Sequence, residues 1–133
     1  MDVSQLKAEY GQTLIGTLGI EFEEATPERV VATMPVDHRT VQPFGILHGG
    51  ASVALAETVA SIGAVLNAGE GRTAVGMEIN ANHIRPKREG RVRAVATPAH
   101  VGRSSSVWEV RITDEAGKLV CISRCTLAFV DAR

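Results

Sequence analysis

The sequence lacks an excess of either charge and a long uninterrupted apolar run. It has 14 Lys and Arg residues against 15 Asp and Glu, a formal net charge of -1. A nucleic-acid-binding surface needs a clear basic excess, so we expect no nucleic-acid partner. The longest apolar stretch, residues 53–66, is interrupted by Glu57 and is shorter than the roughly 20 residues that a membrane-spanning helix needs. Residues 1–5 show no basic segment leading into an apolar run, so we expect no signal peptide, no membrane partner and a cytoplasmic location.

Cysteine is also scarce, with only Cys121 and Cys125 in the sequence. Four residues apart in a strand-like run, they would lie on one face but roughly 13 Å apart along it. A disulfide needs Cα atoms within about 7 Å of each other. We therefore predict two reduced core residues, in keeping with a reducing compartment.

Signatures of several catalytic classes are missing as well. The four histidines (His38, His48, His83 and His100) are scattered without the spacing of metal ligands, so we expect no metal site. There is no Gly-x-Ser-x-Gly nucleophile motif and no phosphate-binding loop. The three serines at 104–106 have no base close by in the sequence and are expected at the start of a strand.

The length of 133 residues suits one domain and is too short for two separate cores, so we predict a single domain over residues 1–133. One helix is apolar on nearly all sides and should be buried on most of them. Two strands, one buried helix and then three or four strands is an α+β order, which favours an antiparallel sheet wrapped around one long helix. The expected helices are 3–13, with Asp2 or Ser4 as N-cap, and 49–67; the expected strands are 18–25, 29–36, 74–83, 91–97, 104–113 and 119–130.

The segment 74–83 alternates between apolar and other residues, which predicts a strand with two distinct faces. One face would carry Val75, Met77, Ile79 and Ala81. The other would carry Gly76, Glu78, Asn80 and Asn82.

The start of the long helix carries an unusual pair of glycines. His48 is expected near the N-cap, followed by Gly49 and Gly50, although each glycine costs a helix up to ~1 kcal/mol relative to alanine. In return the backbone is bare, and unpaired N–H groups at a helix N-terminus can bind an anion or polarise a carbonyl, as in an oxyanion hole. Alternatively, the glycines only permit close packing against a strand.

Glu57 is the only ionisable residue between His48 and Glu70. A buried carboxylate without a nearby cation is costly and has a raised pKa, which makes it a functional candidate. Ser61 lies one helical turn beyond it, within hydrogen-bonding reach. Alternatively, Glu57 reaches solvent at an uncovered edge or pairs with a distant arginine.

The distance between Gly49 and Glu57 adds a constraint. Eight helical residues span roughly 12 Å, so both residues cannot contact one carbonyl within a single chain. A shared site requires Gly49 of one subunit and Glu57 of another. This predicts a two-fold dimer with antiparallel helices side by side and two equivalent sites.

A basic cluster follows in the second half of the sequence. Such side chains would suit a ligand with several phosphates, although a solvated hairpin is the better explanation for most of them. Residues 100–104 are expected to form a turn that contacts phosphate. The basic cluster comprises Arg85, Lys87, Arg88, Arg91, Arg93 and Arg103.

Together these residues resemble a known family. Gln-Pro-Phe-Gly at 42–45, His-Gly-Gly at 48–50 and Leu-Ala-Glu-Thr at 55–58, with Ser61 beyond, are similar to the active-site helix of hotdog-fold thioesterases. The resemblance is greatest to 1,4-dihydroxy-2-naphthoyl-coenzyme A hydrolases and aromatic acyl-coenzyme A thioesterases. Residues 76–83 and 88–92 resemble the same branch, and the similarity extends over residues 14–130.

The resemblance implies a hotdog fold and hydrolysis of an acyl-coenzyme A or acyl-carrier-protein thioester, with an aromatic acyl group favoured. No cofactor is implied, because coenzyme A is part of the substrate. Family members form homodimers, which often pair into homotetramers. Two alternatives stay open: a hotdog hydratase or dehydratase, and a non-catalytic acyl-coenzyme A-binding module, in which Glu57 would have no explanation.

The resemblance also implies roles for individual residues. Glu57 would be the nucleophile or general base, and the Gly49 N–H would polarise the thioester carbonyl. Gln42 and His48 would orient the substrate or water, and Ser61 would position the water or Glu57. The residues chosen for coenzyme binding are His83, Arg85, Arg103 and Ser104.

Overall fold

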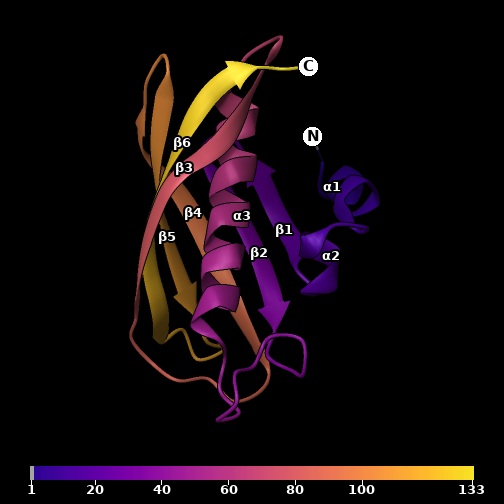
Figure 1. Cartoon of the computed structure of the whole chain (residues 1–133), viewed down its shortest axis with the longest axis vertical. Coiled ribbons are helices and arrows are strands. Elements are labelled where there is room, and N and C mark those ends of the chain that lie inside the picture. The colour runs from indigo at the N-terminus through magenta and orange to yellow at the C-terminus, as the bar shows by residue number, and fades with distance from the viewer. Residues whose placement is uncertain (1) are drawn as a thin grey trace.

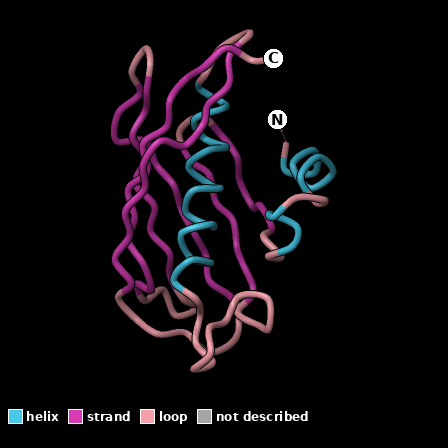
Figure 2. The backbone as a smooth tube through the Cα atoms, viewed as in Figure 1, coloured by secondary structure: helices cyan, strands magenta, loops and turns pink. Residues whose placement is uncertain are grey.

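The computed structural model describes residues 2–133, in which six antiparallel strands wrap around one long helix (Figures 1 and 2). The strands form one sheet in the order β1-β2-β4-β5-β6-β3. This is the α+β hotdog architecture that the sequence predicts. The elements are α1 (Val3–Tyr10), α2 (Leu14–Thr17), β1 (Glu21–Thr26), β2 (Arg29–Pro35), α3 (Gly49–Asn67), β3 (Arg72–His83), β4 (Arg91–Val101), β5 (Ser105–Thr113) and β6 (Leu119–Asp131).

The long helix α3 begins and ends where the sequence predicts and forms the centre of the core. Leu55 and Val59 are fully buried against the sheet. A β-carbon on Gly63 would lie 2.6 Å from Cζ3 of the buried Trp108, so glycine is what lets the helix approach the indole ring. By length and composition alone α3 could cross a membrane. Its packing inside the sheet shows that it is a core helix.

One side of α3 is left partly open, whereas its other sides are covered by the sheet, in keeping with the expected burial on most sides. Val53, Ala54, Glu57, Thr58 and Ser61 form a stripe at helical spacing, and all five are only partly buried. The sheet curls around the opposite side of the helix (Figure 1). Glu57 is therefore half-buried in the single chain, and the prediction that it is buried is wrong for one chain.

The N-terminal helix is shorter than the predicted 3–13. It ends at Tyr10, and α2 begins at Leu14, with Thr13 as its N-cap. Asp2 caps α1 by accepting a 3.0 Å hydrogen bond from the Gln5 N–H, which confirms one of the two predicted caps. The helix α1 lies beside β1, away from α3 (Figure 1), whereas Leu14 of α2 lines a hollow together with Ala51 and Ala54 of α3.

The edge strand β3 contains a β-bulge that changes its faces. Gly76 pairs with Leu127 and Glu78 pairs with Thr126, so Met77 is an extra residue. A bulge of one residue shifts the alternation of every side chain that follows. The predicted apolar face of 75–81 is therefore wrong: Val75 and Met77 are exposed, whereas Ile79 and Ala81 pack against the core.

The two cysteines occupy the core side of β6, as predicted. Both are buried and neither forms a disulfide. Burial, followed by the nearby carboxylates of Glu57 and Glu78, raises the pKa of the Cys125 thiol to about 12. The thiol group therefore stays protonated at neutral pH.

Candidate active site

The N-terminus of α3 presents one free backbone donor. His48 is the N-cap, and its Nδ1 accepts a 2.7 Å hydrogen bond from the Gly50 N–H. The N–H groups of Ala51 and Ser52 donate to the His48 carbonyl, at 3.0 and 3.2 Å. The Gly49 N–H has no acceptor among residues 2–133. It can therefore donate to a substrate oxygen at the positive end of the helix dipole.

Two distant segments hold the backbone just before this donor. The Leu47 N–H donates to the Lys87 carbonyl at 2.7 Å, and the His48 N–H donates to the Thr40 carbonyl at 2.8 Å. These bonds tie the helix start to the loop after β2 and to the segment between β3 and β4. The direction of the Gly49 N–H is thus set by the fold rather than by the flexible glycines themselves.

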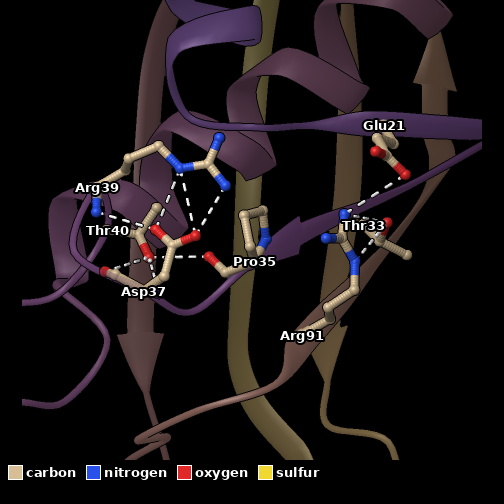
Figure 3. A network of polar contacts seen from close by, with 7 residues as sticks. All are labelled: Glu21, Thr33, Pro35, Asp37, Arg39, Thr40 and Arg91. Carbon is tan, nitrogen blue, oxygen red and sulfur yellow. Dashed lines mark hydrogen bonds and ion pairs between the residues drawn. The ribbon is translucent and has the colours of Figure 1, made fainter.

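Figure 3 shows how the loop carrying Thr40 is itself fixed. The buried Thr40 hydroxyl donates to the Pro35 carbonyl at 2.8 Å and accepts the Asp37 N–H at 3.1 Å. Arg39 forms a 2.7 Å ion pair with Asp37. The hydrogen bonds from Arg39 lower the pKa of Asp37 to about 2, so this carboxylate stays charged across the working pH range.

A cavity of about 350 Å³ lies beside Gly49. It brings together four of the predicted site residues: Gln42, Gly49, His83 and Arg85. The remaining lining is Ile46, Leu47, Ser52, Ile84, Pro86 and Val120.

His48 points away from this cavity. It lines a second hollow of about 280 Å³ together with Arg39, Thr40 and Ala54. In a single chain the structure therefore separates His48 from Gln42, which the sequence placed near the same carbonyl. What His48 does within the chain is cap α3.

Glu57 and Ser61 lie on the open stripe of α3, further along the helix. The carboxylate of Glu57 lies against Gly76 of β3. No hydrogen bond joins Ser61 to Glu57 in the described chain. Glu57 stays roughly 12 Å from Gly49 along the helix, so one chain does not bring all five predicted catalytic residues together.

The predicted coenzyme contacts are also divided. His83 ends β3, whereas Arg103 lies beside the start of β3, where its carbonyl accepts a 3.1 Å hydrogen bond from Arg72. Arg72 and His83 are the two ends of one strand and lie roughly 36 Å apart. Arg103 and Ser104 belong to the turn between β4 and β5. Figure 1 shows this turn at one end of the molecule and the loops before α3 at the other. The predicted turn 100–104 is shorter, because β4 continues to Val101.

Ser52 is a cavity residue that the sequence did not single out. It is 2% exposed and its hydroxyl bonds to no residue among 2–133. Every fully buried side-chain oxygen or nitrogen in that range has a hydrogen-bond partner. Because the Ser52 hydroxyl has none, its oxygen is not fully buried, and it faces the cavity that Ser52 lines. The sequence could have indicated this residue, because Ser52 lies one helical turn after Gly49 and therefore on the same side of α3.

The chemical resources of the chain are a free backbone donor, a cavity beside it and a carboxylate on an open helix face. Donors of this kind stabilise the oxyanion of an acyl-transfer reaction, and a carboxylate can act as base or nucleophile. Within residues 2–133, no three His, Cys, Asp or Glu side chains are placed to hold a metal ion.

Comparison with known proteins points to the same acyl-transfer chemistry. The model of the Thioesterase superfamily matches residues 44–121, more than half of the chain. The chain is similar to 1,4-dihydroxy-2-naphthoyl-CoA hydrolase of Escherichia coli (strain K12), with 51% identity over 117 residues that cover 88% of this chain and 86% of that protein. It is also similar to the proofreading thioesterase EntH of Cronobacter turicensis, with 48% identity over 130 residues, 98% of this chain and 95% of that protein.

A solved structure gives the same result for the fold. Thioesterase HI1161 from Haemophilus influenzae superimposes with a TM-score of 0.95 and 48% sequence identity, covering 98% of this chain and 92% of that chain. The match extends over the sheet, α3 and the loops that carry the site. The chain therefore belongs to the thioesterase superfamily and is a hotdog-fold thioester hydrolase.

Proposed function

We propose that this enzyme hydrolyses an acyl-coenzyme A thioester, with an aromatic acyl group favoured. The observation that carries the proposal is the free Gly49 N–H beside a cavity of about 350 Å³. The acyl group is inferred from the similarity to a protein named for naphthoyl-CoA hydrolysis. No cofactor takes part, because coenzyme A is the leaving group.

In the proposed reaction the thioester carbonyl accepts a hydrogen bond from the Gly49 N–H, which stabilises the oxyanion that forms as the nucleophile adds. Collapse of this oxyanion breaks the C–S bond and releases coenzyme A as its thiolate. Glu57 acts in one of two ways. As a general base it takes a proton from the attacking water. As a nucleophile it forms an anhydride with the acyl group, which water then hydrolyses. Gln42 and His48 orient the substrate or water, and Ser61 positions the water or Glu57.

The complete site is assembled by two subunits. Gly76 lies against Glu57 and His83 lies against Gly49, so β3 follows the helix from one half-site to the other. The outer edge of β3 pairs with no other strand of the described chain. If two β3 edges pair antiparallel about an axis near Ile79 and Asn80, Gly76 of one subunit stands opposite His83 of the other. Glu57 of one subunit then meets Gly49 of the other.

The same pairing supports the coenzyme contacts. In that register Arg72, at the start of β3 in one subunit, lies near the end of β3 in the other, just beyond His83. Arg103, bonded to Arg72, then comes to the end of the sheet that carries His83 and Arg85. Arg85, Arg103, His83 and Ser104 could in this way contact the phosphates of one coenzyme A molecule. Residues that lie at opposite ends of one chain thus converge in the dimer.

Three further points belong to the proposal. An acyl-carrier-protein thioester is a second substrate form, since both carriers present the same pantetheine thioester. The assembly is a homodimer, which pairs into a homotetramer if it follows the resemblance. We also propose a cytoplasmic location, because buried thiols suit a reducing compartment.

The test is release of free thiol from a panel of aryl, short-chain and long-chain acyl-coenzyme A substrates, using wild type and Glu57→Gln. We expect thiol release to be fastest with an aryl substrate and to fall ~100-fold or more in Glu57→Gln, the effect of losing a base or nucleophile. A hydratase would consume an enoyl substrate without thiol release. A binding module would bind substrate without turnover, and wild-type rates in Glu57→Gln would exclude Glu57 from the chemistry.

A further inference from the structure

Gly76 is a glycine that its own backbone does not require. It lies inside β3, where glycine weakens a strand because it has no side chain to pack. Its φ angle is not in the positive range that six other glycines of the described chain adopt. Glycine inside a strand often marks a place where another group approaches closely. The reason for a glycine here is therefore space.

The space is taken by one side chain. A β-carbon on Gly76 would overlap Oε2 of Glu57 and lie 3.1 Å from its Cδ and 3.7 Å from its Cγ. These are the three nearest atoms, and none belongs to the backbone or to another residue. An added methyl group would displace the Glu57 carboxylate, which ends a flexible side chain, and would leave the sheet in place.

Packing is the only restraint that the chain places on this carboxylate. Glu57 makes no side-chain hydrogen bond and no ion pair within residues 2–133. Its position is set by the helix on one side and by the bare strand at Gly76 on the other. The bulge at Met77 comes directly after Gly76, so the strand cannot shift to compensate without losing its register.

We propose that Gly76 is a positioning residue for Glu57. Because Gly76 has no side chain, the Glu57 carboxylate can lie against β3, where it reaches the substrate in the shared site. This inference rests on the proposed role of Glu57. Gly76 has no side chain that could take part in the reaction. It acts only by leaving room for the carboxylate.

The experiment is a double-mutant cycle with Gly76→Ala and Glu57→Ala, because a cycle isolates the effect that one residue has through another. In the wild-type background we expect Gly76→Ala to lower kcat at least ~10-fold, while KM and the Kd for a non-hydrolysable thioether analogue change less than ~2-fold. In the Glu57→Ala background, where no carboxylate remains to be displaced, Gly76→Ala should change the residual rate less than ~2-fold.

Each other outcome overturns the inference. An equal loss in both backgrounds would show that Gly76→Ala damages the site without involving Glu57. An unchanged kcat in Gly76→Ala, with Glu57→Ala inactive, would show that Glu57 needs no such room. A Gly76→Ala protein that fails to fold would show that more than one flexible side chain occupies the space. Failure of the proposed function is distinct, because it would appear as an active Glu57→Ala enzyme.

Discussion

The imidazole of His83 packs against the backbone of Gly49, with its Nε2 2.8 Å from where a β-carbon of residue 49 would stand. This contact joins the end of β3 to the start of α3. Gly76, which lies against Glu57, is seven residues earlier in the same strand. In a regular strand an odd separation would put the two residues on opposite faces. The bulge at Met77 adds the residue that turns both toward α3.

The shared site predicts complementation between two inactive variants. Gly49→Val should block the approach of the carbonyl, and Glu57→Ala should remove the carboxylate. Mixed dimers would contain one doubly damaged site and one intact site. After joint unfolding and refolding with random pairing, about half of the dimers are mixed, so activity should recover to about a quarter of wild type.

Two controls make this measurement decisive. Mixed dimers must be shown by mass spectrometry of differently tagged chains. Gly49→Val must be shown to fold by circular dichroism, since the new side chain has to displace His83. If mixed dimers form and no activity returns, each site lies within one chain and the proposed β3 pairing is wrong.

Arg103 provides a test of the coenzyme contact. Removing a phosphate contact weakens ground-state and transition-state binding equally, so Arg103→Ala should raise KM for acyl-coenzyme A several-fold with kcat largely retained. Steady-state kinetics would measure both. The matched control is Arg111→Ala, near the end of β5 that lies away from the β4–β5 turn. An unchanged KM in Arg103→Ala would show that Arg103 makes no contact with coenzyme A and is an ordinary solvated surface residue.

Ser52 reports whether substrate enters the cavity beside Gly49. Ser52→Leu places extra carbon atoms in that space and should raise KM at least ~10-fold, which corresponds to about 1.4 kcal/mol of lost binding. Ser52→Ala is the control, because it removes only a hydroxyl that bonds to no described residue and should change stability by less than about 0.5 kcal/mol. A wild-type KM in a folded Ser52→Leu enzyme would place the substrate elsewhere.

The ion pair between Lys87 and Glu115 predicts a pH-dependent stability. The hydrogen bond from Lys87, followed by one from the Arg91 N–H, lowers the pKa of Glu115 from 4.5 to about 2. A lowered pKa in the folded state gives stability that is fully present above the unfolded pKa and is lost as pH falls toward the folded one. The difference in Tm between wild type and Glu115→Gln should therefore be constant above pH ~5 and shrink toward pH ~2.

Glu9→Gln is the control for this series, because Glu9 forms no ion pair in the described chain. Its Tm difference from wild type should stay small at every pH. If the Glu115→Gln difference were the same at pH 3 and pH 7, Glu115 would be protonating with an ordinary pKa.

The sequence was sufficient for α3 because its signals are local. Gly49 and Gly50 mark one end, Gly69 follows the other, and the apolar residues between them require a sheet to cover them. The bulge was not predictable, since alternation through 74–81 fits a regular strand equally well. Only the pairing of Gly76 with Leu127 and of Glu78 with Thr126 reveals the extra residue.

The site was predictable in its residue types but not in its arrangement. An apolar helix does not show which face its sheet leaves open, so the exposure of Glu57 could not be read from the sequence. The separation of His48 from Gln42 likewise depends on contacts with Thr40 and Lys87, and Lys87 is far away in the sequence. Local patterns located the chemistry, and long-range contacts decided its geometry.

The bulge in β3 also bears on how a newly made subunit avoids aggregation. An unpaired edge strand offers its N–H and C=O groups to any extended chain, and natural proteins often interrupt such edges with bulges and charges. Met77 interrupts the regular spacing of N–H and C=O groups along the outer edge of β3, and Glu78 next to it adds a negative charge. A straight foreign strand could follow only part of such an edge, whereas a second copy, in the proposed register, places its own interruption symmetrically about the axis. The residue that aligns the two half-sites would then also favour pairing with the correct partner.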